Sequence, residues 1–200
     1  MKQDLKKIEW HVIHCSATRP NHDIGVKEIN QWHEAPCDIK DKNGHVTGVR
    51  YHRKIYGSRL ALPKHELNGI PIINLTGRGW WDPQAEMGCG YHIIVRLDGS
   101  AEVGRPINIV GAHVHGFNIG SLATVYIGGL DKLGNPKDTR TDAQKKTLKL
   151  IDEQWKDLFH GIKTRGHRDF SPDIDGDGVI EPFEWMKACP CFDVKKEFGS

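Results

Sequence analysis

Residues 8–15, with the sequence IEWHVIHC, constrain the possible fold more than any other segment. Successive side chains of this segment alternate between two faces, and His14 lies on the same face as Val12. Such alternation is typical of a β-strand. Residues 24–35 follow with apolar side chains at roughly helical spacing, and Pro36 ends the pattern. A strand followed directly by a helix indicates an α/β fold, with His14 near the carboxyl end of its first strand.

The C-terminal half repeats this alternation. The sequence predicts a β-hairpin with an Asp-Gly turn in residues 90–105, a strand in 122–130, a helix from Thr141 to His160 and a strand in 162–167. Thr141 and Gln144 have the spacing of a capping box at the start of that helix. His167 ends the last strand, so two histidines lie at the carboxyl ends of strands, where open α/β sheets place their sites.

Length and composition favour one domain. A chain of 200 residues with 38% hydrophobic residues is enough for a single core, so we expect one domain over 1–200. Residues 36 to about 78 are rich in Gly, Pro and basic residues and have no long helical period, which indicates an insertion. Within it, an Asn-Gly pair predicts a small hairpin.

Net charge and the lack of targeting signals give no support for a nucleic-acid or membrane partner. The net charge is only +2, so nothing demands nucleic acid or an anionic membrane. The N-terminus lacks the apolar core of a signal peptide, and no stretch approaches the ~18 apolar residues of a membrane span. We therefore expect synthesis in the cytoplasm without membrane insertion. Five cysteines, an odd number, favour metal binding or catalysis over a disulfide framework in that compartment.

Four residues have side chains that suit zinc: His14, His167, Cys189 and Cys191. Zinc accepts imidazole nitrogen and thiolate sulfur in a tetrahedron. Spacing alone does not select a zinc site, because strand-end histidines also occur as hydrogen-bonded structural residues and cysteines as small buried apolar residues.

Several motifs occur together in a characteristic order: VIHCSAT, GYHIIVRLDGSAEVGR, VGAHVHGFN, IGG and HRD followed by KACPCFD. In this order the chain resembles the type 2 N-acetylmuramoyl-L-alanine amidases, especially the phage zinc amidases, and the peptidoglycan recognition proteins that share their fold. The resemblance covers about three quarters of the chain. It implies a central mixed β-sheet flanked by helices.

The resemblance also implies an active site. His14, His167 and Cys189 correspond to the family's three zinc ligands, which leaves the fourth zinc position open for water, as catalysis requires. Tyr91 and Lys187 correspond to the two other active-site groups. We expect Lys187 to stabilise an oxyanion, and Tyr91 either to orient the water or to stabilise the same oxygen.

Other residues near these motifs have two interpretations each. His113 corresponds to a family histidine near the substrate cleft, or is a hydrogen-bonded loop residue. Trp80, with its neighbour Trp81, either stacks on substrate or packs in the core. Cys191 departs from the family pattern, where serine is common. As a fourth zinc ligand it would convert an open catalytic site into a closed structural one, but the intervening proline argues against this geometry.

The acidic loop of residues 173–184 matches the EF-hand pattern, with Gly178 at position 6. Its expected calcium ligands are Asp173, Asp175, Asp177, the Val179 carbonyl and Glu184. A calcium loop is favoured over a bare acidic turn, because closely spaced carboxylates repel one another without a cation. A helix leaving this loop would then present Lys187 and Cys189 to the zinc.

The expected function is hydrolysis of the bond between N-acetylmuramic acid and L-alanine, with zinc and also calcium bound. The alternative is a recognition module that binds peptidoglycan without cleaving it. Since family members that only bind commonly lack the thiolate ligand, Cys189 and Tyr91 favour the enzyme. We expect a monomer that acts on the cell wall after release, as a phage endolysin or a delivered toxin.

Overall fold

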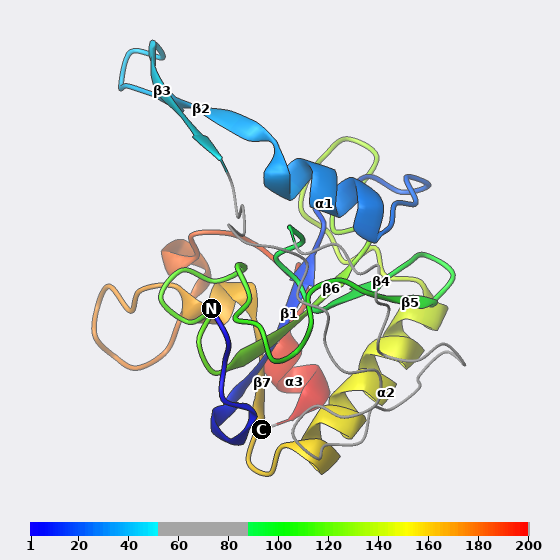
Figure 1. Ribbon diagram of the computed structural model, residues 1–200. Coiled ribbons are helices and arrows are strands. Elements are labelled where there is room, and N and C mark those ends of the chain that lie inside the picture. The colour runs from blue at the N-terminus through cyan, green and yellow to red at the C-terminus, as the bar shows by residue number, and fades with distance from the viewer. Residues whose placement is uncertain (52–87, 200) are drawn as a thin grey trace.

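A mixed five-stranded sheet forms the centre of the molecule in the computed structural model, which describes residues 1–51 and 88–199 (Figure 1). The strand order is β5-β4-β6-β1-β7. The strands are β1 (Trp10–Cys15), β4 (Ile93–Val95), β5 (Ala101–Val103), β6 (Ser121–Tyr126) and β7 (Lys163–Gly166). β1 is parallel to β6 and β7, β4 is parallel to β6, and β5 is antiparallel to β4. The expected α/β class with a mixed sheet is confirmed.

Three helices and three short 3-10 turns accompany these strands in the described residues; two of the helices lie between strands, and the other helical segments lie before β1 or after β7. The helices are α1 (Val26–Glu34), α2 (Asp142–Leu158) and α3 (Val194–Phe198), and the turns are η1 (Leu5–Lys7), η2 (His167–Phe170) and η3 (Pro182–Glu184). Thr141 caps α2, accepting a hydrogen bond from Gln144 as the capping box predicts. In the described parts of the chain, no helix is long and apolar enough to span a bilayer.

A separate hairpin is formed by β2 (Pro36–Lys40) and β3 (Val46–Tyr51), which are antiparallel. It extends beyond α1, away from the central sheet (Figure 1). The Asn-Gly turn predicted for this region joins the two strands, and Gly44 has a φ of 84°. The remainder of the predicted insertion, residues 52 to about 78, lies outside the described residues. The single-domain organisation stays a prediction.

The central sheet is buried on both faces, as its near-continuous apolar strands require. Ile93 and Val95 of β4 pack in a cluster with Leu148 and Trp155 of α2, while Ile94 packs in a second cluster with Ile29 of α1. Successive side chains of a strand point to opposite faces, so the two helices cover opposite sides of the sheet.

The strand expected over 122–130 is shorter than predicted. β6 ends at Tyr126, and both Gly128 and Gly129 have positive φ angles, of 137° and 99°. Such angles interrupt the extended conformation. The strand predicted over 162–167 likewise ends at Gly166, and His167 begins η2 immediately beyond it.

A buried polar network joins α2 to the sheet. His11 of β1 is fully buried, with its Nδ1 3.0 Å from Asp152 Oδ1 and its Nε2 2.9 Å from Thr124 Oγ1. The Thr164 hydroxyl donates to the same carboxylate, and Lys156 Nζ lies 2.8 Å from Asp152 Oδ2. Burial of these polar groups is tolerated because each finds a partner.

Candidate metal centre and active site

The register of two parallel strands brings His14 and His167 together. Ile13 of β1 lies opposite Gly166 of β7, so the next residues along the chain, His14 and His167, come side by side at the carboxyl end of β7. The two imidazole rings are 4.7 Å apart between centroids. His14 is almost fully buried and His167 is half-buried. The predicted pair of strand-end histidines is therefore adjacent in space.

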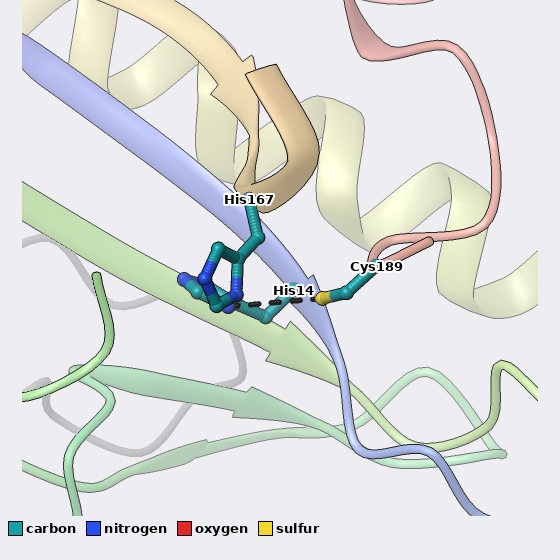
Figure 2. Close-up of side chains that lie close together, drawn as sticks. All are labelled: His14, His167 and Cys189. Atoms are coloured by element: carbon teal, nitrogen blue, oxygen red, sulfur yellow. Dashed lines mark hydrogen bonds between the residues drawn. The ribbon is translucent and has the colours of Figure 1, made fainter. Parts of the chain in front are cut away.

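Cys189 reaches the same point from the C-terminal loop. Its Sγ lies 3.8 Å from His14 Nδ1 (Figure 2), and the backbone N–H of Cys15 donates to it at 3.2 Å. The loop is fixed on both sides of the sulfur: Arg168 N–H donates to the Cys189 carbonyl at 2.8 Å, and the Tyr126 hydroxyl donates to the Pro190 carbonyl at 2.6 Å. The thiol is thus aimed at the histidines by backbone contacts.

One potential ligand atom from each of His14, His167 and Cys189 lies within 4.8 Å of the other two. Two imidazole nitrogens and one sulfur suit zinc, and the mutual distances allow one ion to contact all three. Because three protein ligands leave one tetrahedral position for water, this donor set fits a catalytic metal better than a closed structural one.

Tyr91 lies beside this cluster. Its ring is 5.0 Å from that of His14 and 5.1 Å from that of His33, which is in the last turn of α1. The N–H of Gly90 donates to His33 Nδ1 at 2.8 Å. Tyr91 is therefore half-buried between the imidazoles of two histidines. The backbone just before it, at Gly90, is fixed by the hydrogen bond to His33.

His113 contacts the cluster from the side away from Cys189. Its Nδ1 lies 3.1 Å from His14 Nε2 and its Nε2 lies 3.2 Å from Ser121 Oγ. The residue is only 5% exposed and contacts His14; its position along the substrate cleft stays a prediction. The other residue predicted to line the cleft, Trp80, lies outside the described residues.

Comparison with known proteins identifies the family. The chain is 30% identical over 184 residues to the endolysin of Klebsiella phage KP32, an alignment that covers 92% of this chain and 81% of that protein. The chain belongs to the phage endolysin family. Another endolysin, from Escherichia phage T7, is 27% identical over the same shares of both chains. No protein-family model matches the sequence.

Solved structures place this endolysin in the amidase and recognition-protein fold. The peptidoglycan recognition protein PGRP-SA of Apis mellifera matches with a TM-score of 0.55 at 14% identity, covering 98% of this chain and 84% of that one. The N-acetylmuramoyl-L-alanine amidase LysC of Clostridium intestinale matches with a TM-score of 0.54 at 15% identity, covering 98% and 86%. The fold and family expected from the motifs are thereby confirmed.

Cys191 takes a different direction from Cys189 in this endolysin. Its Sγ lies 3.8 Å from Cys15 Sγ and 3.2 Å from the Gly129 carbonyl. The hydrogen bond with Cys15, together with burial, raises the pKa of the Cys191 thiol, which disfavours the thiolate that zinc binds. Within the described chain, the group that includes Cys189 contains the two histidines and not Cys191.

Lys187 is exposed, two residues before Cys189. Its ammonium makes no hydrogen bond or ion pair with the described residues, so the structure does not join it to the cluster. A flexible side chain of this length can reach a substrate without such contacts. Its assignment to the oxyanion stays a prediction.

The acidic loop brings its carboxylates together. Asp173, Asp175 and Glu184 form one group with oxygens within 4.8 Å, and Asp175 and Asp177 form another with Glu181. Glu184 is 3% exposed and accepts hydrogen bonds from the backbone N–H groups of Ile174 and Glu181. Burial, followed by repulsion from the neighbouring carboxylates, raises the pKa of Glu181.

The helix expected to leave this loop is absent. The helical part of this segment is the single 3-10 turn η3 (Pro182–Glu184), which includes the last of the carboxylates, and residues 185–188 are irregular. Pro182 at the first helical position allows a helical start, but the turn ends at Glu184 because Trp185 has an extended backbone conformation, with φ of −64° and ψ of 115°. The prediction that a helix presents Lys187 and Cys189 was wrong. The side chain of Val179 is 53% exposed, while the role of its carbonyl stays a prediction.

Proposed function

We propose that this endolysin is a zinc-dependent N-acetylmuramoyl-L-alanine amidase that degrades bacterial peptidoglycan. The observation that carries the proposal is the convergence of His14, His167 and Cys189 at one edge of the sheet. Endolysin relatives and the amidase fold support a lytic amidase in general. Dependence on zinc and cleavage of this particular amide bond go beyond that general support and are what we propose.

The residues have distinct parts in this reaction. Zinc held by the three ligands would lower the pKa of a water molecule and polarise the scissile carbonyl. Tyr91, whose ring lies beside that of His14, would hydrogen-bond to that water or to the oxygen that becomes negative. Lys187 would add positive charge near the same oxygen once substrate is bound.

Two neighbouring cysteines give a matched test of the metal site. Cys189→Ala removes a ligand, so the purified variant should lose bound zinc and should no longer clear suspensions of cell walls. Cys191→Ala removes a similar half-buried thiol two residues away and should retain both. Zinc content and turbidity are measured on the same preparations. Equal zinc content in the two variants would show that Cys189 is not a ligand.

We also propose that the carboxylates of residues 173–184 bind calcium. Three features support it: the EF-hand spacing, the short distances between carboxylate oxygens and the buried Glu184. The loop also lies between two zinc ligands, His167 and Cys189. Its two sides meet where the Met186 N–H donates to Ser171 Oγ at 3.1 Å. Calcium would therefore stabilise the segment that carries the thiolate.

The proposed substrate lies outside the cytoplasmic membrane. The protein would act on peptidoglycan as a monomer after release from the cell in which it is made. Pure protein that binds cell walls without cleaving them would instead support the recognition-module alternative, whose fold is the same.

A further inference from the structure

The two ring nitrogens of His14 face different partners. Nδ1 lies 3.8 Å from Cys189 Sγ, on the side of the three-ligand cluster, and Nε2 lies 3.1 Å from His113 Nδ1. A neutral imidazole carries one proton, and only the unprotonated nitrogen can bind a metal. If His14 is a zinc ligand through Nδ1, its proton must therefore be on Nε2.

Ser121 determines where the neighbouring protons lie. Its hydroxyl is fully buried and has one hydrogen, and Oγ contacts the Phe117 carbonyl at 2.7 Å, the Asn118 carbonyl at 3.1 Å and His113 Nε2 at 3.2 Å. Carbonyl oxygens only accept hydrogen bonds. The one hydroxyl hydrogen is best placed on the Phe117 carbonyl, the shortest of the three contacts, and Ser121 Oγ would then accept a hydrogen bond from His113 Nε2–H.

The same logic continues to His14. With its proton on Nε2, a neutral His113 presents an unprotonated Nδ1, which accepts from His14 Nε2–H at 3.1 Å. His14 is then left with a lone pair on Nδ1. In the protein without metal, the Cys189 thiol can donate to that lone pair, so the arrangement is consistent on both sides of the ring.

The surroundings hold the His113 ring in this position. Asn118 Oδ1 accepts hydrogen bonds from the backbone N–H groups of His113 and Val114, at 2.8 and 3.0 Å. A Cβ atom at Gly111 would lie 2.4 Å from the His113 ring, closer than real side chains approach. Glycine at 111 therefore makes room for the imidazole, and the Asn118 contacts fix its backbone.

We propose that Ser121 and His113 are positioning residues that fix the tautomer of His14 and thereby direct Nδ1 to the metal. The proposal rests on the zinc site proposed above. It also assigns to His113 a part other than contact with substrate. Outer partners of metal-binding histidines commonly contribute 10- to 100-fold in metal affinity, and removal of the Ser121 hydroxyl is expected to cost about tenfold by this principle.

The same strand supplies a matched control. Thr124 of β6 also places a buried hydroxyl on an imidazole, that of His11, on the opposite face of the sheet. Ser121→Ala and Thr124→Val each delete one such hydroxyl. Zinc affinity, measured by competition with a chelating indicator, should fall about tenfold in Ser121→Ala and stay unchanged in Thr124→Val. An equal affinity in the two variants would overturn the proposal.

Substitutions of His113 separate hydrogen bonding from packing. Asparagine can place an acceptor near the position of Nδ1, whereas leucine has none. His113→Asn should keep zinc affinity within a few-fold of the native protein, and His113→Leu should weaken it at least tenfold. If both variants lose the same affinity, the ring acts only through packing and the proposal is wrong.

A direct observation of the tautomer does not depend on zinc binding. Nitrogen-15 NMR of the native, metal-free protein should show protons on Nε2 of both His14 and His113. A proton on His14 Nδ1 would contradict the inference, whatever the metal affinity. A native protein with the expected tautomers but no affinity for zinc would instead refute the proposed function and leave the hydrogen-bond order intact.

Discussion

At the scale of single residues, the least expected contribution is that of His33. It lies at the end of α1, far in sequence from Tyr91, and the helical pattern gives it no special status. In the fold its Nδ1 accepts the Gly90 N–H and its ring is 5.1 Å from that of Tyr91. His33 therefore links α1 to the backbone that carries the tyrosine, and we regard it as a positioning residue.

Replacing His33 tests this role. His33→Ala should lower kcat about tenfold, because small displacements of a reacting group are costly, while KM and zinc content stay close to native. His33→Asn restores an acceptor for the Gly90 N–H and should recover most of the rate. Steady-state kinetics on soluble muropeptides provide the measurement.

The control is His45→Ala, because this histidine is on the projecting hairpin with a side chain 78% exposed. It should match the native enzyme in both constants. A His33→Ala variant with native kcat, or one that loses zinc, would contradict the idea that His33 acts only by positioning Tyr91.

At the scale of secondary-structure elements, the strands were predictable and the C-terminal segment was not. Period-two alternation locates β1 because its side chains pack on opposite faces, and the Thr141 capping box locates the start of α2. Residues 185–193 lack such a period. Their path depends on distant partners such as Tyr126 and Arg168, which no local pattern reveals.

The acidic loop belongs to this scale, since it joins η2 to the Cys189 loop. Glu184→Gln removes one charge from a buried carboxylate, so calcium affinity should fall at least tenfold, given the importance of the last loop position. Calorimetric titration of the metal-stripped protein measures the affinity, and thermal unfolding with and without calcium measures the stabilisation.

Asp4→Asn is a suitable control, because it removes a carboxylate that caps η1 instead. Calcium should raise the unfolding temperature of this variant as it does that of the native protein. Absence of calcium binding by the native chain below millimolar concentrations would rule out the site.

At the scale of the whole molecule, the sheet topology explains the position of the candidate active site. Parallel β1 and β7 end at one edge, which juxtaposes His14 and His167, and the sequence already placed both at strand ends. Cys189 has a side chain that suits zinc, but its selection as the third proposed ligand, and the roles of Tyr91 and Lys187, come from the family resemblance. Hydrogen-bond partners such as Ser121 and Asn118 could not be anticipated, because their contacts arise from loop geometry.

The central claim, that this fold carries an amidase, is tested most directly by the chemistry of digested cell walls. Purified peptidoglycan incubated with the native protein should acquire new amino termini on L-alanine, with no new reducing sugar ends. Chelator should abolish the reaction and added zinc should restore it. Peptidoglycan that is bound but gains no L-alanine amino termini, or that gains reducing ends instead, would contradict the account.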